Sequence, residues 1–173
     1  MRDRLARIFT RKPAYKPGPP PPPRLILTES CVSALSECME PEIRRGHEGV
    51  AYVLGQTDGA VTLAIAAVRP QAATTRGSFF VSAPAMAQVV RTAIRAGLQV
   101  IGQVHTHPGK AYHSDGDVEG ARIVYRGFVS VVLPDYGRRL PTLDGAAVYM
   151  FRGKAGFAEI APEHAGIVPR RLQ

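Results

Sequence analysis

The chain has 173 residues, of which 45% are hydrophobic and 21% charged, and it contains no tryptophan. This length suits one domain with its own core, because domains cluster near about 100–150 residues. No apolar run approaches the roughly 20 residues that cross a bilayer, and no signal-peptide core follows the first basic residues. We therefore expect a cytoplasmic protein without a transmembrane segment. Cys31 and Cys38 are too few for a disulfide framework and are predicted to be buried, reduced thiols.

The basic charge of the chain is unevenly distributed. The formal net charge is +8, but residues 1–24 alone carry +6, which leaves +2 for the rest of the chain. A nucleic-acid-binding domain would concentrate its basic charge on a folded face. The sequence therefore predicts no specific nucleic-acid partner.

The first 24 residues have the composition of a tail. Residues 13–23 contain seven of the fifteen prolines, and such a run adopts extended polyproline II without a packed core. We predict that residues 1–24 form a disordered, basic, proline-rich linker. A short amphipathic helix within residues 4–11, able to contact an acidic surface or membrane, is the alternative. The folded domain is expected over residues 25–165, followed by a C-terminal tail over 166–173.

The hydrophobic periodicity of the remaining chain predicts alternating strands and helices. In chain order we expect an edge strand at 25–27, a helix capped by Thr28 and ended by Pro41, a strand at 50–54 closed by Gly55, a hairpin turn at 56–59, a strand at 61–65, a helix from Pro84 to Gly97 with Ile94 on its apolar face, a strand at 98–105, a helix starting within 114–124, and strands at 128–133 and 146–151. This order predicts the α/β class, with a mixed central β-sheet flanked by helices.

The segment from Gln103 to Asp117 contains the side chains best suited to chemistry. Because side chains alternate across a strand, His105 and His107 project on the same side and can present two imidazoles to one ion. Ser114 is a good helix N-cap, and Asp117 follows it in the first turn. This carboxylate could complete a site of two histidines and one aspartate that leaves a fourth position for water, as in catalytic zinc sites. Taken alone, each feature also has an ordinary explanation, such as a core histidine or a capping box.

A hydrolytic metal site also needs a base that accepts a proton from water. Glu48 is the strongest candidate, because it directly precedes an apolar strand that we expect to be central in the sheet. A carboxylate at the mouth of a hydrophobic sheet is costly without a partner or a task.

Together these positions resemble the JAMM (JAB, or MPN-plus) metalloprotease family in its bacterial form. The residues that carry the resemblance are Glu48 with Gly55 seven positions later, His105-x-His107-Pro108, and Ser114-x-x-Asp117. The order of elements over residues 25–160 agrees with it. The resemblance implies a JAB/MPN architecture, which is similar to that of cytidine deaminases.

The resemblance also implies roles for individual residues. The metal would be one Zn²⁺ per chain, with His105, His107 and Asp117 as its ligands. Glu48 would act as general base and then as general acid, and Ser114 would help to stabilise the oxyanion. No covalent intermediate is required, so neither cysteine has a catalytic part.

The third metal ligand has competitors within the same loop. Nine residues separate His107 from Asp117, whereas the common family pattern has ten, so the loop closes one residue tighter. Asp115 and His113 lie close enough in sequence to compete, and His113 could also lie on the substrate side. Asp117 is preferred because it alone preserves the Ser-x-x-Asp spacing.

The function implied by the resemblance is that of a zinc-dependent isopeptidase or peptidase. It would hydrolyse the bond after the C-terminus of a ubiquitin-like protein or its conjugates, beside E1-like and E2-like partners. The alternatives are a sulfur-carrier-processing metalloprotease and a non-catalytic MPN scaffold; a zinc deaminase is disfavoured because Pro-Cys-x-x-Cys is absent. Residues 134–144 could contact substrate or form an ordinary hairpin connection. His47 and His164 belong to no motif and are expected to be structural or exposed.

Overall fold

A computed structural model describes residues 22, 24–120, 123 and 125–169. Almost all of the predicted N-terminal tail and the last four residues lie outside the described residues. The described elements, in chain order, are β1 (Arg24–Thr28), α1 (Glu29–Arg45), β2 (Val50–Thr57), β3 (Val61–Val68), β4 (Ala72–Thr74), β5 (Phe79–Val81), α2 (Ala83–Arg95), β6 (Gln99–Thr106), α3 (Asp115–Gly120), β7 (Val129–Leu133), η1 (Asp135–Gly137), β8 (Ala147–Phe151), η2 (Gly153–Ala155), β9 (Phe157–Glu159), η3 (Pro162–His164) and β10 (Ala165–Val168).

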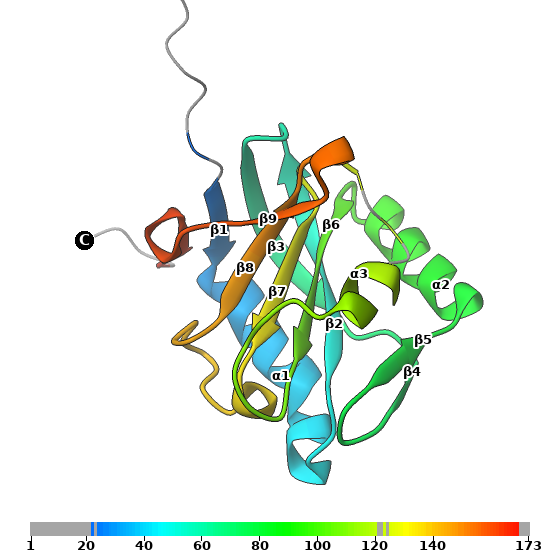
Figure 1. Cartoon of the computed structure of the whole chain (residues 1–173). Helices are drawn as coiled ribbons and strands as arrows, with labels where there is room; N and C mark the ends of the chain where they lie inside the picture. Colours follow the sequence, from blue (N-terminus) through cyan, green and yellow to red (C-terminus); the bar gives the residue numbers. More distant parts are fainter. Residues whose placement is uncertain (1–21, 23, 121–122, 124, 170–173) are drawn as a thin grey trace, which may run out of the picture.

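One sheet of eight strands forms the centre of the described structure (Figure 1). Its strand order is β10-β1-β3-β2-β6-β7-β8-β9, and β4 and β5 form a separate hairpin. The pairs β1–β10, β1–β3 and β6–β7 are parallel, whereas the other neighbours are antiparallel. This confirms the mixed central sheet that the sequence predicts.

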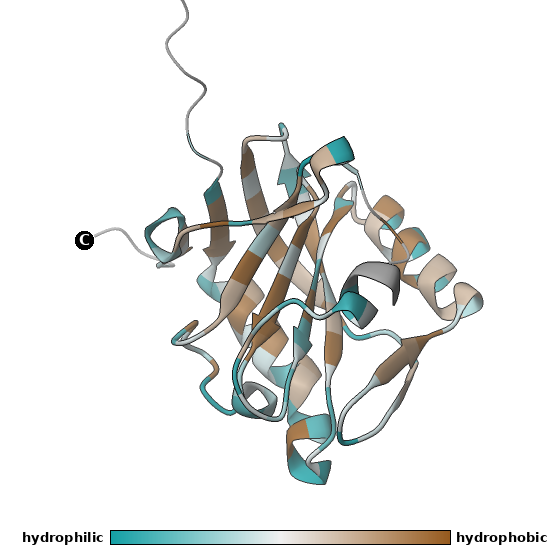
Figure 2. Ribbon diagram, in the orientation of Figure 1, coloured by the Kyte–Doolittle hydropathy of each residue, from teal (hydrophilic) through white to brown (hydrophobic). Residues whose placement is uncertain are grey.

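Helix α1 covers one face of the sheet. Its buried side chains Val32, Leu35 and Met39 recur at helical spacing and pack against the inward residues of β1, β2, β6 and β7. The helix begins at the expected cap, because the Thr28 hydroxyl accepts the Cys31 N–H at 3.1 Å. In Figure 2 the brown, hydrophobic positions gather on the strands, and teal positions occupy the loops.

Helix α2 lies against the opposite face, beside the β4–β5 hairpin (Figure 1). Its residues Met86, Val89 and Ala93 pack on Tyr52 and Leu54 of β2 in a second hydrophobic cluster. The central strands are thus buried on both faces, which explains the continuous apolar runs in their sequences.

Pro41 does not end α1, contrary to the sequence prediction. The helix continues to Arg45 and closes with Gly46 in the left-handed region at φ 64°. Proline removes only one backbone donor here, near the end of the helix. We attribute the continuation to the packing of Met39, Glu42 and Ile43 against the sheet, which offsets this loss.

The structure differs from the sequence prediction in three further respects. β1 is not an edge strand, because β10 pairs with it in parallel; the sheet therefore extends past residue 165, where we expected the domain to end. Ile94 is 69% exposed rather than part of the buried face of α2. The short strands β4, β5 and β9 were not predicted.

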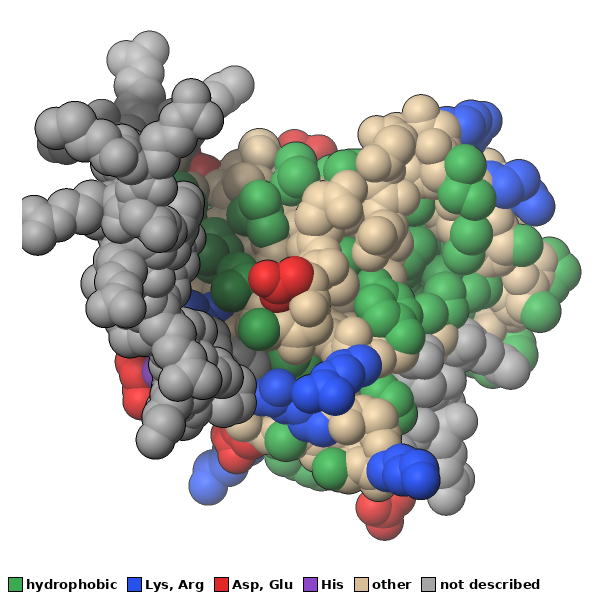
Figure 3. Space-filling model, turned by 90° about the horizontal axis from the view of Figure 1, so that it is seen from above, with side chains coloured by type: hydrophobic (Ala, Val, Ile, Leu, Met, Phe, Trp, Pro, Cys, Tyr) green, Lys and Arg blue, Asp and Glu red, His purple; other side chains and the backbone are tan. Residues whose placement is uncertain are grey.

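Within the described residues, no helix is long and apolar enough to cross a membrane. Figure 3 shows the molecule from above, and the lysine and arginine side chains visible there form separate groups with hydrophobic and uncharged surface between them.

Candidate metal centre

The register between β2 and β6 aligns the predicted base with the two histidines. Val50 lies opposite His105, and the Thr106 N–H donates to the Gly49 carbonyl at 3.1 Å. The Thr106 hydroxyl accepts the Gly49 N–H at 2.8 Å, which holds the end of the pair together. His105 and His107 alternate onto the α2 face, as the sequence predicts, and Glu48 reaches that face from the start of β2.

The third group comes from the N-terminus of α3. The Ser114 hydroxyl donates to Asp117 Oδ2 at 2.7 Å, and the Ser114 N–H donates to the same oxygen at 2.8 Å. In return, the Asp117 N–H donates to Ser114 Oγ at 3.2 Å. This reciprocal capping arrangement fixes the aspartate over the end of β6. The Ser114 hydroxyl donates its proton to Asp117 in this arrangement. The predicted role of Ser114 at an oxyanion therefore stays a prediction.

The three predicted ligands meet in one cluster. Asp117 Oδ1 lies 3.1 Å from His105 Nε2, and Asp117 Oδ2 lies 3.4 Å from His107 Nε2. One ligand atom from each of the three residues lies within 4.8 Å of the others. The loop that is one residue shorter therefore still brings Asp117 to the histidines.

The competing residues are not part of this cluster, although the His113 ring centroid lies 6.5 Å from that of His105. The His113 ring stacks on Tyr149, with centroids 4.7 Å apart, and meets Phe157 edge-on at the same distance. Asp115 is exposed. Among the described residues, neither belongs to the cluster that could hold a metal ion. His113 instead anchors the loop to β8 and β9.

The chemistry of the cluster fits a divalent metal ion. His105 is completely buried, and neither of its ring nitrogens has a well-aligned hydrogen bond to any described group. A buried polar atom without a partner is costly, and a metal bond would satisfy one of these nitrogens. Two imidazoles and one carboxylate form a common donor set for such an ion.

The pKa values of the three clustered side chains are shifted by burial and by one another. Burial raises the pKa of Asp117, but the close His105 and His107 imidazoles and the hydrogen bonds from Ser114 outweigh it and hold this pKa well below the usual carboxyl range. Burial lowers the pKa of His105, so its imidazole is neutral, as a metal ligand must be. The hydrogen bond with Asp117 raises the pKa of His107.

Glu48 is buried beside this cluster. Its backbone N–H donates to the Thr75 carbonyl at 2.8 Å, which ties it to the β4–β5 hairpin. Burial raises the pKa of Glu48, the charge of His107 lowers it, and that of Asp117 raises it further, with a net increase. A carboxylate with a raised pKa is suited to accept a proton near neutral pH.

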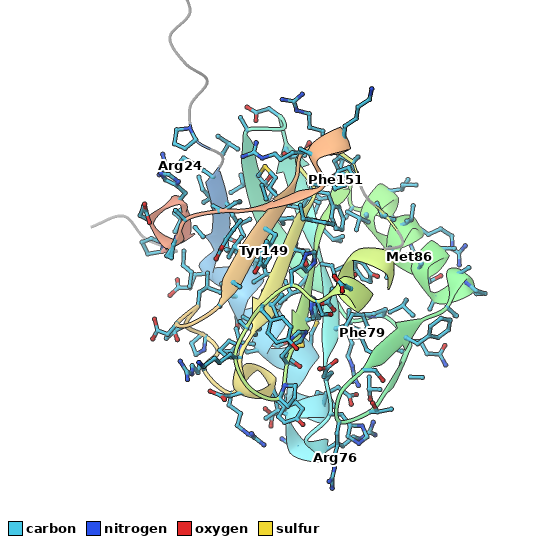
Figure 4. All side chains as sticks on the ribbon, viewed as in Figure 1. Arg24, Arg76, Phe79, Met86, Tyr149 and Phe151 are labelled. Carbon is cyan, nitrogen blue, oxygen red and sulfur yellow. The ribbon has the colours of Figure 1, made fainter. Side chains whose placement is uncertain are left out.

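A cavity of about 550 Å³ opens onto Glu48, His107, Ser114 and Asp117. Its other walls come from residues that the sequence did not single out, including Tyr52, Gln103, Tyr112 and the β5 strand. Phe79 of β5, labelled in Figure 4, lies with its ring centroid 5.4 Å from that of His105 and covers this histidine. Aromatic and polar residues at alternating strand positions were the only sequence signal for these walls.

The 134–144 segment lies beside the metal loop. The Tyr136 N–H donates to the His107 carbonyl at 2.8 Å, and the Asp135 N–H donates to the Gly109 carbonyl at 3.0 Å. Both Asp135 and Tyr136 have positive φ. The segment contributes Pro134, Asp135 and Arg139 to a separate, shallower pocket of about 430 Å³. Its contact with substrate therefore remains a prediction.

This geometry defines a cluster of two histidines and one aspartate that could hold a metal ion, with a neighbouring glutamate. Comparison with known proteins agrees: residues 35–141 match the family described as prokaryotic homologues of the JAB domain. The chain belongs to this family.

Two individual proteins illustrate the relationship. A protein of Sinorhizobium fredii named probable metalloprotease y4jG is 30% identical over 140 residues, which cover 79% of this chain and 86% of that protein. The solution structure of protein DSY2949 from Desulfitobacterium hafniense superposes with a TM-score of 0.60 and 16% identity, covering 86% of this chain and 94% of the other. The second similarity shows the fold alone.

Proposed function

We propose that this protein is a zinc-dependent isopeptidase or peptidase that hydrolyses the bond after the C-terminus of a ubiquitin-like protein. The observation that carries the proposal is the meeting of Glu48 with His105, His107 and Asp117 at one end of a cavity. Membership of the JAB family and similarity to a protein named as a probable metalloprotease support it.

The roles of the residues follow from their positions. The two imidazoles and the Asp117 carboxylate would hold Zn²⁺, for which such a donor set with an open position is typical. When bound, the ion would supply Lewis-acid chemistry, which acidifies water and polarises a carbonyl group. The Glu48 carboxylate accepts the proton of the attacking water and then donates it to the departing amine nitrogen. Ser114 keeps Asp117 in position through its two hydrogen bonds.

The cavity supports a narrow substrate segment. The wall formed by β5 belongs to a two-stranded hairpin, and an extended peptide could pair with it as an added strand. A flexible C-terminal tail could enter a space of about 550 Å³, whereas a folded domain could not.

The test combines metal analysis with cleavage assays. We expect one zinc per chain, and cleavage of a ubiquitin-like fusion by the wild-type protein but not by Glu48→Gln. Parallel fusions to sulfur-carrier proteins separate the two substrate classes. Stoichiometric zinc without cleavage of either class would overturn the protease proposal and favour a non-catalytic scaffold.

A further inference from the structure

Gln103 is one of the cavity residues that have no role in the proposed chemistry. Its side chain is only 7% exposed, yet it lines the cavity. Among the residues that the structure describes, none makes a hydrogen bond with its side-chain amide. Among the described residues, the fully buried side-chain atoms without a partner are those of His105, so the amide of Gln103 is still reached from the cavity. An amide that has no partner in the protein and lines a cavity is free to bond to a bound molecule.

The strand register places Gln103 at a definite distance from the catalytic end. Gln103 pairs with Tyr52, and His105 pairs with Val50, so both side chains of β6 lie on one face at successive inward positions. A strand rises about 3.3 Å per residue, so the four residues from His107 to Gln103 span about 13 Å. The cavity therefore extends inward from Glu48 and His107 by the length of about four extended residues.

The surroundings of Gln103 are mostly apolar. Phe79 and Val81 of β5 line the same cavity, as does the buried ring of Tyr52. A hydrocarbon side chain would fill this position as well, and it would need no hydrogen bonds. The amide becomes favourable when a bound molecule supplies both a donor and an acceptor, as one residue of a peptide main chain does.

We propose that Gln103 determines specificity by hydrogen-bonding the main chain of the substrate's C-terminal tail, at the third or fourth residue before the scissile bond. This inference rests on the proposed function. Only the tail can reach Gln103, because the amine side of an isopeptide bond is a single lysine side chain, shorter than about 13 Å. The contact favours substrates that enter as an extended, unfolded tail of at least four residues.

The first test is a series of substrates that differ only in length. Acetylated peptides of two to six residues, with Gly-Gly at the end, alanine elsewhere and aminomethylcoumarin as leaving group, contain no polar side chain. We expect kcat/KM of the wild-type protein to rise about tenfold when the peptide grows from two to four residues, which corresponds to one buried hydrogen bond. Gln103→Leu should lose this increase and cleave the dipeptide substrate at the wild-type rate.

A matched control and a second variant keep the test interpretable. Ser130 pairs with Gln103 on the neighbouring strand and is equally buried, but it does not line the cavity. Ser130→Ala should therefore keep the length dependence. Gln103→Met, which preserves side-chain length and flexibility, replaces Gln103→Leu if the latter fails to fold. A length dependence unchanged in the folded Gln103 variant, or an equal loss for short and long peptides, would overturn the proposal.

A binding measurement separates this inference from the proposed function. A fluorescein-labelled hexapeptide ending in Gly-Gly carboxylate is titrated with zinc-loaded protein, and its anisotropy is recorded. If the wild-type protein cleaves none of the substrates, the proposed function fails, but this titration still tests Gln103. We expect about tenfold weaker binding by Gln103→Leu than by Ser130→Ala, whereas equal binding would contradict the assignment.

Discussion

At the scale of single residues, the site consists of groups whose positions would be unfavourable without a task. Both ring nitrogens of His105 are buried without well-aligned hydrogen bonds to the described groups. Glu48 is a buried carboxylate that lies close to the Asp117 carboxylate. A metal ion at this site would relieve both conditions, because it would bind an imidazole nitrogen and offset the negative charges. The predictions at this scale therefore separate binding of the metal from turnover.

Glu48→Gln should keep the metal and lose turnover. Glutamine preserves size and polarity but cannot accept a proton, and positioned general acid–base groups contribute about 10²–10⁴-fold to rates. Metal content by mass spectrometry should stay at one ion per chain, while kcat falls by at least about 100-fold. Glu37→Gln, an exposed change on α1, serves as the control and should keep the wild-type rate. A Glu48→Gln enzyme with near-normal kcat would remove this residue from the mechanism.

Changes to the three predicted ligands, unlike Glu48→Gln, should remove the bound metal itself. His107→Ala and Asp117→Ala each remove a donor atom from a three-residue cluster, and the bound metal should fall toward zero. Asp115→Ala removes an equal charge two residues away on the same helix but should leave one ion per chain, because Asp115 is exposed outside the cluster. Full metal content in Asp117→Ala, or its loss in Asp115→Ala, would mean that the third ligand is misassigned.

At the scale of elements, a buried polar cluster fixes the segment that carries Glu48. The Glu42 carboxylate of α1 accepts hydrogen bonds from Arg69, beyond β3, at 2.6 Å and from Thr74 of β4 at 2.7 Å. The His47 ring nitrogen Nδ1 lies 3.2 Å from the Thr74 hydroxyl. His47, expected to be structural or exposed, thus belongs to the structural support of the site.

Glu42→Gln should impair both stability and kcat. The amide cannot neutralise Arg69, which is partly exposed, so we expect a loss of about 1–2 kcal/mol in the free energy of unfolding. Because β4 also positions the Thr75 carbonyl that binds the Glu48 N–H, kcat should fall more than KM rises. Urea denaturation and steady-state kinetics measure the two effects.

Glu40→Gln provides a matched control on the same helix, since Glu40 pairs with Arg44 on the exposed surface. We expect a stability change below about 0.5 kcal/mol and unchanged kcat for this variant. If the two variants behaved alike, the buried cluster would have no special part in positioning Glu48.

The elements also show which parts of the fold a single sequence reveals. The alternation of His105 and His107 and the Ser114-x-x-Asp117 cap depend on contacts within one segment, so they could be predicted. The position of Glu48 opposite them depends on the β2–β6 register. Its place before an apolar strand and the family resemblance both indicated Glu48, but neither gives that register. The β4–β5 hairpin lacks a clear alternating pattern, and its turn is held by polar contacts between Thr75 and Ser78. β9 is only three residues long and pairs with the preceding β8, whereas β10 exists through pairing with β1 at the other end of the domain.

At the scale of the whole molecule, the sheet connects two hydrophobic cores, and the candidate metal centre lies on the α2 face at the end of β6. The α1 core lies across the sheet from the site. Asp117 and the two histidines come from segments separated by a loop, so a bound ion crosslinks α3 to the sheet. A ligand that binds only the folded state stabilises it by RT ln(1 + L/Kd), where L is the concentration of free ligand. A probe in the α1 core should therefore report metal binding.

Cys31 is such a probe, because it is completely buried between α1 and the sheet. Burial raises the pKa of its thiol to about 12, so at pH 8 only about one thiol in 10⁴ ionises without opening of the fold. In a Cys38→Ser background, reaction with a thiol reagent should require unfolding. Zinc at about 100 times its dissociation constant stabilises the folded state by about 2.7 kcal/mol, so labelling should slow about 100-fold and recover with a chelator. In His107→Ala, zinc should leave the labelling rate unchanged. If zinc also left the labelling rate of the protein with His107 intact unchanged, the ion would not bind and stabilise the folded molecule as a whole.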